Sequence, residues 1–148
     1  MLVAFCALGA AGPMAAAECE GRETATKLLV HVTGVSGSRG EVAVTVYPDD
    51  PRRFLAPKGK LLRARVPART PVTSACFWLP RAGVYAIAVY HDTNADHDFN
   101  RNLAGLPVEG FGFSNDPPTS IGLPPFRSVR FSVAGPESVI RVKLRYLR

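Results

Sequence analysis

Residues 84–90 of this 148-residue chain read Val-Tyr-Ala-Ile-Ala-Val-Tyr, the most apolar strand-like run in the sequence. Side chains of this run are apolar on both faces of an extended strand, which is typical of a central strand covered on both sides. Residues 91–100 follow directly and read His-Asp-Thr-Asn-Ala-Asp-His-Asp-Phe-Asn. Asp or Asn stands at every second position of this segment, and core packing does not require such a pattern. The sequence therefore places one candidate functional loop directly beside its central strand.

Period-two runs lie on both sides of the central strand, with apolar residues on one face and polar residues on the other. In the last run, Ile140, Val142, Leu144 and Tyr146 share the apolar face. We predict an all-β fold, a single antiparallel β-sandwich of about seven strands with an immunoglobulin-like arrangement. One long loop excursion, rich in glycine and proline, follows the central strand. A small closed barrel is the alternative. The expected strands cover residues 28–33, 41–47, 61–66, 72–79, 84–90, 129–133 and 140–146.

The N-terminal residues have the character of an export signal. Residues 2–11 form a short apolar run, and three alanines at 15–17 supply the small residues of a signal-peptidase site. We therefore expect residues 1–17 to be a cleaved signal peptide and residues 18–26 to be a loose lead-in. Residues 27–148 then form a single β-sandwich domain. The protein is expected to be exported, to the periplasm or the extracellular space.

Cysteine content and charge bear on compartment and partners. Cys6 falls in the signal, which leaves Cys19 and Cys76 as an even pair. An oxidising compartment favours a disulfide between them, and two unpaired thiols are the alternative. The net charge of +6 comes mostly from arginines scattered through the strands, without a nucleic-acid-binding signature. We expect no nucleic acid as a partner. Anionic cell-envelope polymers, or simply a solvated basic face, fit better, and the chain is expected to be monomeric.

Oxygen-bearing side chains in the loop favour a hard cation such as calcium, which takes six to eight oxygen ligands. They match the first five liganding positions of an EF-hand, but His97 and Leu103 stand where its turn glycine and bidentate glutamate belong. A calcium loop of another design would use Glu109 as a distant carboxylate. The alternative is a turn whose Asp and Asn side chains bond their own backbone without metal. The candidate metal ligands are Asp92, Asn94, Asp96, Asp98, Asn100 and Glu109.

Two further functions are compatible with the same residues. A metal-dependent hydrolase would use His91, Asp92, His97 and Glu109, although no cysteine lies near them to support a zinc site. Ser114 lacks the surroundings of a nucleophilic serine. A purely structural envelope protein would need no ligand. We expect a non-enzymatic module with calcium in the loop at residues 91–100, with no catalytic residues and no other cofactor.

Several specific runs lie in the loop and in the Gly- and Pro-rich arm after it, residues 105–125. They are His91-Asp92, Asn94, Asp96, the run Leu-Ala-Gly-Leu-Pro at 103–107 and the run Glu-Gly-Phe-Gly-Phe-Ser-Asn at 109–115. In these runs the chain closely resembles a bacterial exported family of unknown function, DUF2141. The resemblance spans residues 28–146. It implies an exported β-sandwich similar to transthyretin-like and carboxypeptidase-regulatory-like modules, with no established activity and no known catalytic residues.

This chain departs from the family's loop at three positions. The family usually has glycines where Ala95 and His97 stand, and often aspartate at Asn100. Histidine tolerates a left-handed backbone better than most residues, so the turn is expected to survive. Asparagine in place of aspartate removes a charge and should weaken a calcium site.

Overall fold

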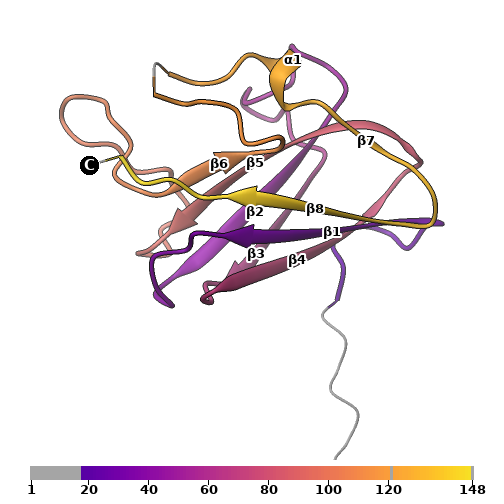
Figure 1. The fold of residues 1–148 in the computed structure, drawn as a ribbon, viewed down its shortest axis with the longest axis horizontal. Coiled ribbons are helices and arrows are strands. Elements are labelled where there is room, and N and C mark those ends of the chain that lie inside the picture. Colours follow the sequence, from indigo (N-terminus) through magenta and orange to yellow (C-terminus); the bar gives the residue numbers. More distant parts are fainter. Residues whose placement is uncertain (1–17, 121, 148) are drawn as a thin grey trace, which may run out of the picture.

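The computed structural model describes residues 18–120 and 122–147, so the expected signal at 1–17 lies outside the described residues (Figure 1). Nearly all regular structure is β, arranged in two sheets, which confirms the predicted β-sandwich. Among the described residues no helix is long and apolar enough to cross a membrane. The elements are β1 (Thr26–Thr33), β2 (Glu41–Pro48), β3 (Leu62–Pro67), β4 (Val72–Leu79), β5 (Gly83–Asp92), β6 (Phe111–Phe113), α1 (Phe126–Val129), β7 (Phe131–Val133) and β8 (Glu137–Lys143).

The larger sheet is built around β5. This strand pairs with β2 along one edge, while β7 and β6 share the other edge and pair with its first and second halves. Ser114 fills the gap between these two short strands. Its hydroxyl accepts the Ile87 N–H at 2.9 Å and donates to the Val129 carbonyl, and its own N–H donates to the Ile87 carbonyl. The hydroxyl of Ser114 is therefore part of the sheet and is fully buried.

The smaller sheet has the order β4-β1-β8, and one of its pairings differs from the expected antiparallel pattern. β1 pairs antiparallel with β4 but parallel with β8. The chain leaves β7 in the larger sheet, crosses to the smaller one through a turn at Gly135, and so arrives beside β1 in the same direction. The short strand β6 and the single helical turn α1 were not expected from the sequence, because no periodicity extends far enough there. α1 ends at Val129, so the strand expected at 129–133 begins only at Phe131.

Alternating side chains of β1, β2 and β5 meet between the sheets and form the main core, and Val142 and Leu144 close it from the C-terminal side. A second cluster lies on the outer face of the larger sheet. There the arm lays aromatic side chains over β5, including Phe111 and Phe113 from β6. In Figure 1 the arm and α1 cover the side of the larger sheet that faces away from β1. Both faces of β5 are thus covered, as its composition requires.

The lead-in is not loose, in contrast to the expectation for residues 18–26. The Glu20 N–H donates to the Cys76 carbonyl, and the Trp78 N–H donates to the Glu20 carbonyl, so this segment continues the sheet at the edge of β4. A disulfide joins Cys19 to Cys76 beside these bonds. The polar composition of the segment gave no sign of this pairing, because backbone groups make it.

The last strand offers a direct test of the sandwich core. Leu144 is 3% exposed, whereas Val139 is 57% exposed on the other face of the same segment. We predict that Leu144→Ala lowers the free energy of unfolding by about 2–5 kcal/mol, because it leaves a cavity in the core. Val139→Ala is the control and should change it by less than about 0.5 kcal/mol. Urea denaturation followed by circular dichroism measures both, and equal costs would contradict the assignment of faces.

Candidate metal site

Asp92 ends β5 and holds the candidate loop in place. Strand alternation turns its side chain to the outer face of the sheet, where the carboxylate is fully buried. Oδ1 accepts the Asp96 N–H at 3.2 Å, and Oδ2 accepts the His97 N–H at 2.8 Å. Arg65 on β3 places Nη1 3.5 Å from Oδ2. The buried charge is therefore compensated by one cation and by the loop's own backbone.

The loop returns to Asp92 because two residues adopt left-handed backbone angles. φ is 53° at Ala95 and 66° at His97. Gly40 explains the tight approach from the other side. Its φ is 70°, and a Cβ there would lie 2.0 Å from the carbonyl oxygen of Asp92. The turn before β2 therefore packs against the first residues of the loop.

Asp96 is the exposed acceptor at the centre of the loop. Its Oδ2 accepts the side-chain N–H groups of Asn94 and Asn100, each at 3.0 Å, and its Oδ1 accepts the Asp98 N–H at 2.9 Å. These hydrogen bonds, above all that from Asn100, hold the pKa of Asp96 below its usual range. Asp96 is therefore a stable anion.

Glu109 approaches the same point from the segment that precedes β6. The side chain is 3% exposed, and Oε2 accepts the Asn100 N–H at 3.0 Å. Oε1 is buried and has no hydrogen-bond partner among the described residues. Burial raises the pKa of Glu109, and the charges of Asp92 and Asp96 raise it further, against a smaller lowering by the backbone N–H groups of Asn100 and Thr93. A buried carboxylate oxygen without a donor is rare in proteins and calls for an explanation.

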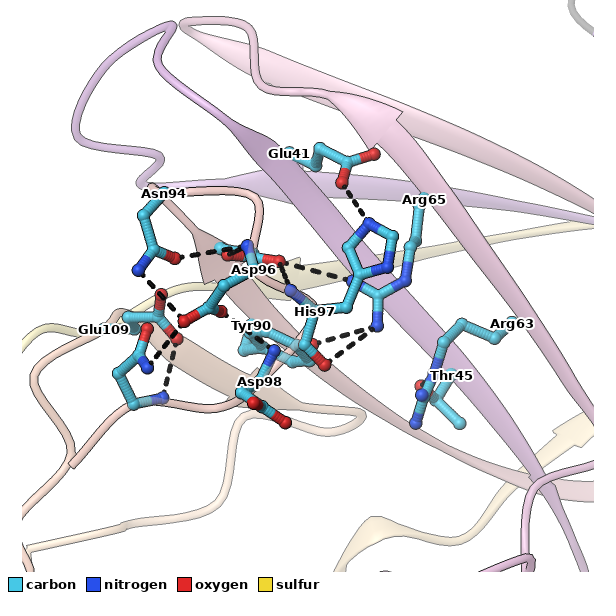
Figure 2. Close-up of polar contacts among 12 residues, drawn as sticks. Glu41, Thr45, Arg63, Arg65, Tyr90, Asn94, Asp96, His97, Asp98 and Glu109 are labelled. Atoms are coloured by element: carbon cyan, nitrogen blue, oxygen red, sulfur yellow. Dashed lines mark hydrogen bonds and ion pairs between the residues drawn. The ribbon is translucent and has the colours of Figure 1, made fainter.

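Three carboxylates thus converge. One oxygen each from Asp92, Asp96 and Glu109 lies within 4.8 Å of the others, and Figure 2 shows Asp96 and Glu109 next to each other. Arg65 is the one cation paired with this group in the described chain, so its net charge is about −2 when all three are ionised. A second cluster joins Glu41, Asp92 and His97, in which Nε2 of His97 lies 3.0 Å from Oε1 of Glu41. Arg65 and Glu41 come from strands remote in the sequence, and no local pattern marks them.

The remaining predicted ligands are placed differently. Asn94 and Asn100 border the carboxylates but turn their amide nitrogens toward Asp96. Figure 2 shows the Asp98 carboxylate directed away from Asp96 and Glu109, and Asp98 belongs to neither carboxylate cluster. The alternation of oxygen-bearing side chains is thus present in the chain, while only part of it points to one place.

His91 does not join the four residues proposed for a hydrolase. It neighbours Asp92 on β5 and therefore faces the opposite side of the sheet, between the two layers. Nε2 lies 2.7 Å from the Arg39 carbonyl, to which it must donate, so Nδ1 accepts from the Tyr146 hydroxyl at 2.9 Å. The Tyr146 hydroxyl also accepts the Ser36 N–H. His91 ties a turn to the C-terminal segment, and the expected set of His91, Asp92, His97 and Glu109 is not assembled.

A family model described as "Uncharacterized protein conserved in bacteria (DUF2141)" matches residues 30–141. The matched region contains β5, the candidate loop and Glu109. Neither a search of curated proteins nor a search of solved structures finds a match. The family supplies no activity, so the function rests on the geometry of the site.

The unpaired oxygen of Glu109 leads to a prediction for the metal-free protein. Glu109→Gln should raise the free energy of unfolding at neutral pH by roughly 1–3 kcal/mol, because an amide N–H replaces an unsatisfied anionic oxygen and donates to Asp92 or Asp96. A raised carboxyl pKa makes the wild-type chain lose stability as pH rises through it. The gain should therefore vanish below the ordinary pKa of glutamic acid. Thermal melting with EDTA at both pH values measures it, and a less stable variant at neutral pH would contradict it.

Proposed function

The chain belongs to the DUF2141 family of uncharacterised bacterial proteins, and we propose that it is a non-enzymatic module that binds calcium between Asp92, Asp96 and Glu109. The single observation that carries this proposal is Oε1 of Glu109, a buried carboxylate oxygen without a donor. A cation beside it supplies the missing partner. A divalent cation also neutralises the net charge of the three carboxylates and Arg65.

The ligand chemistry favours calcium over other divalent ions. All candidate ligands are oxygens, and most of them lie on a loop outside the strands, an arrangement that suits calcium better than magnesium, which demands near-ideal octahedral geometry. Neither cysteine nor histidine belongs to the cluster of Asp92, Asp96 and Glu109, so it lacks the ligands that attract zinc. A rotation of the Asn94 and Asn100 side-chain amides brings their oxygens toward Asp96, so both can become ligands. With few charged ligands, we expect a dissociation constant on the order of 10⁻⁴–10⁻³ M.

A structural role without any ligand is the second candidate, and one observation favours it. Both oxygens of Asp92 and both oxygens of Asp96 already accept hydrogen bonds from the loop itself. Such a loop folds without metal, as in an Asx-rich turn. The unsatisfied oxygen of Glu109 is what this alternative leaves unexplained.

The calcium proposal predicts a change in thermal stability. Calcium at about a hundred times its dissociation constant should stabilise the wild-type chain by roughly 2.7 kcal/mol, because it binds only the folded state. Asp96→Ala should abolish this gain. Asp98→Ala is the matched control: it removes the same charge from the same loop and should keep the gain. Differential scanning calorimetry with calcium and with EDTA measures each.

Two results would contradict the proposal. One is a wild-type melting temperature that does not respond to millimolar calcium. The other is an equal loss of the response in Asp96→Ala and Asp98→Ala, which would mean that calcium only screens surface charge. If instead Asp96→Ala lowers the melting temperature in EDTA and calcium has no effect, the loop is a structural turn.

We also propose that the module is exported and is similar to transthyretin-like and carboxypeptidase-regulatory-like sandwiches. The composition of residues 1–17 and the family resemblance support export, and the disulfide between Cys19 and Cys76 fits an oxidising compartment. Expression of the full chain in a bacterium should yield a periplasmic protein that begins near Glu18, with a mass lower by two hydrogens than the reduced form. Mass spectrometry of the periplasmic fraction measures both. A full-length chain with free thiols would contradict export.

A further inference from the structure

The outer face of the larger sheet has a hollow at its centre, and the strand register explains it. Thr45 on β2 stands directly opposite Ala88 on β5. On either side of this pair, Arg63 on β3 faces Thr45, and Phe113 on β6 faces Ala88. Two small residues therefore form the floor of the row, and two large side chains stand at its ends. The next outward position along β5 carries Tyr90, which raises a wall beside the floor.

Aromatic rings enclose the hollow. Tyr90, Phe99, Phe111 and Phe113 form a chain of tilted or edge-to-face contacts, with successive ring centroids 5.5, 5.8 and 6.1 Å apart. Phe99 belongs to the candidate calcium loop and reaches over the sheet. The groove that remains has a volume of about 250 Å³. This is near the lower end of the range for small-molecule sites and accommodates one compact molecule.

Two arginines give the groove a positive rim. Arg63 donates from Nε to the buried Thr45 hydroxyl at 2.8 Å, and Figure 2 shows the two side chains together, apart from the carboxylates. Arg101 stacks over Phe99 with its guanidinium 5.4 Å from the ring centroid, and it donates to the Gly105 carbonyl. Both line the groove, and neither forms an ion pair with any residue in the described ranges. No Asp, Glu, Asn or Gln lines it.

We propose that this groove binds a small aromatic carboxylate, with the ring over Thr45 and Ala88 and the carboxylate at Arg63 and Arg101. Aromatic walls favour a ring that can join their edge-to-face contacts. Guanidinium groups are suited to carboxylates because their paired N–H donors match the two oxygens. No residue of the carboxylate cluster Asp92, Asp96 and Glu109 lines the groove, and the proposal does not require bound calcium.

Sugars and peptides fit the groove less well. A neutral sugar needs several acceptors as well as donors around its hydroxyls. The lining is mostly aromatic and aliphatic, and its polar side-chain groups are two guanidinium groups, one threonine and two tyrosine hydroxyls, without a carboxylate or amide. A peptide that binds by adding a strand needs an exposed row of backbone groups, but both edges of β5 beside the groove are paired. A compact anion with an apolar body satisfies both the walls and the rim.

Naphthoate is a suitable probe, because it combines two fused rings with one carboxylate. We expect it to bind the mature chain in EDTA with a dissociation constant on the order of 10⁻⁴–10⁻³ M, as its few atoms allow. Backbone amide chemical shifts of isotope-labelled protein measure the affinity and the place. The shifts should concentrate at Thr45, Arg63 and Ala88. The neutral isostere naphthyl methanol should bind at least roughly tenfold more weakly, since it lacks the charge-assisted hydrogen bonds.

Three variants separate anion recognition from general charge and from filling of the groove. Arg63→Gln should weaken naphthoate roughly tenfold or more and leave naphthyl methanol unchanged. Arg141→Gln is the matched control, because Arg141 is exposed on β8 in the other sheet, and it should change nothing. Ala88→Leu should prevent both ligands from binding by filling the floor. The amide shifts of this variant outside the groove should match those of the wild type, which would show that its fold is kept.

The proposal is overturned by any of four results. The first is the absence of shifts with naphthoate up to its solubility limit, and the second is a set of shifts that lies away from the groove. Naphthyl methanol as strong as naphthoate would remove the role of the arginines. Equal weakening by Arg63→Gln and Arg141→Gln would show attraction to net positive charge alone.

Discussion

Strand β5 carries apolar side chains on both faces, and each face has to be covered. The smaller sheet covers the inner face, where Ile87 and Val89 meet the core. The outer face has no second sheet, so the arm that follows β5 folds back over it with aromatic side chains. The loop at residues 91–100 connects β5 to this arm, so it lies at the end of the central strand. The burial requirement of one strand thus decides where the polar loop lies.

Asp92 makes that reversal of the chain possible at the cost of a buried charge. An unpaired carboxylate at this position would be strongly destabilising, and its partners are Arg65 and two N–H groups of the loop itself. The loop is therefore organised before any ligand arrives. The entropy cost of ordering the loop is therefore part of folding. A bound cation gains attraction mainly from Asp96 and Glu109, whose charges no cation of the described chain neutralises.

Local patterns predicted what lies within one strand, and pairing decided the rest. Alternation gave the strand runs and the inward face of Val142 and Leu144, which are buried. It could not give the parallel partner of β8 or the contact of Arg65 with Asp92, because both depend on which strands become neighbours. Within the loop, spacing indicated the oxygen-rich positions. The left-handed angles at Ala95 and His97 change the side-chain directions after them, so Asp98 points away although it continues the alternation.

The proposed calcium site and the proposed carboxylate groove share one element. Phe99 follows Asp98 and precedes Asn100, and its ring is a wall of the groove. Arg101, two residues after Phe99, lies at the rim. Any change in the order of the loop therefore moves groove-lining groups. Asp92 already holds the loop as far as His97. If calcium restricts the residues that follow, it also fixes Phe99 and Arg101, and part of the ordering cost of the second ligand is already met. By thermodynamic linkage, an aromatic carboxylate in the groove then strengthens calcium binding by the same factor. The short segment between Asp96 and Arg101 is thus a physical route by which the two sites can be coupled.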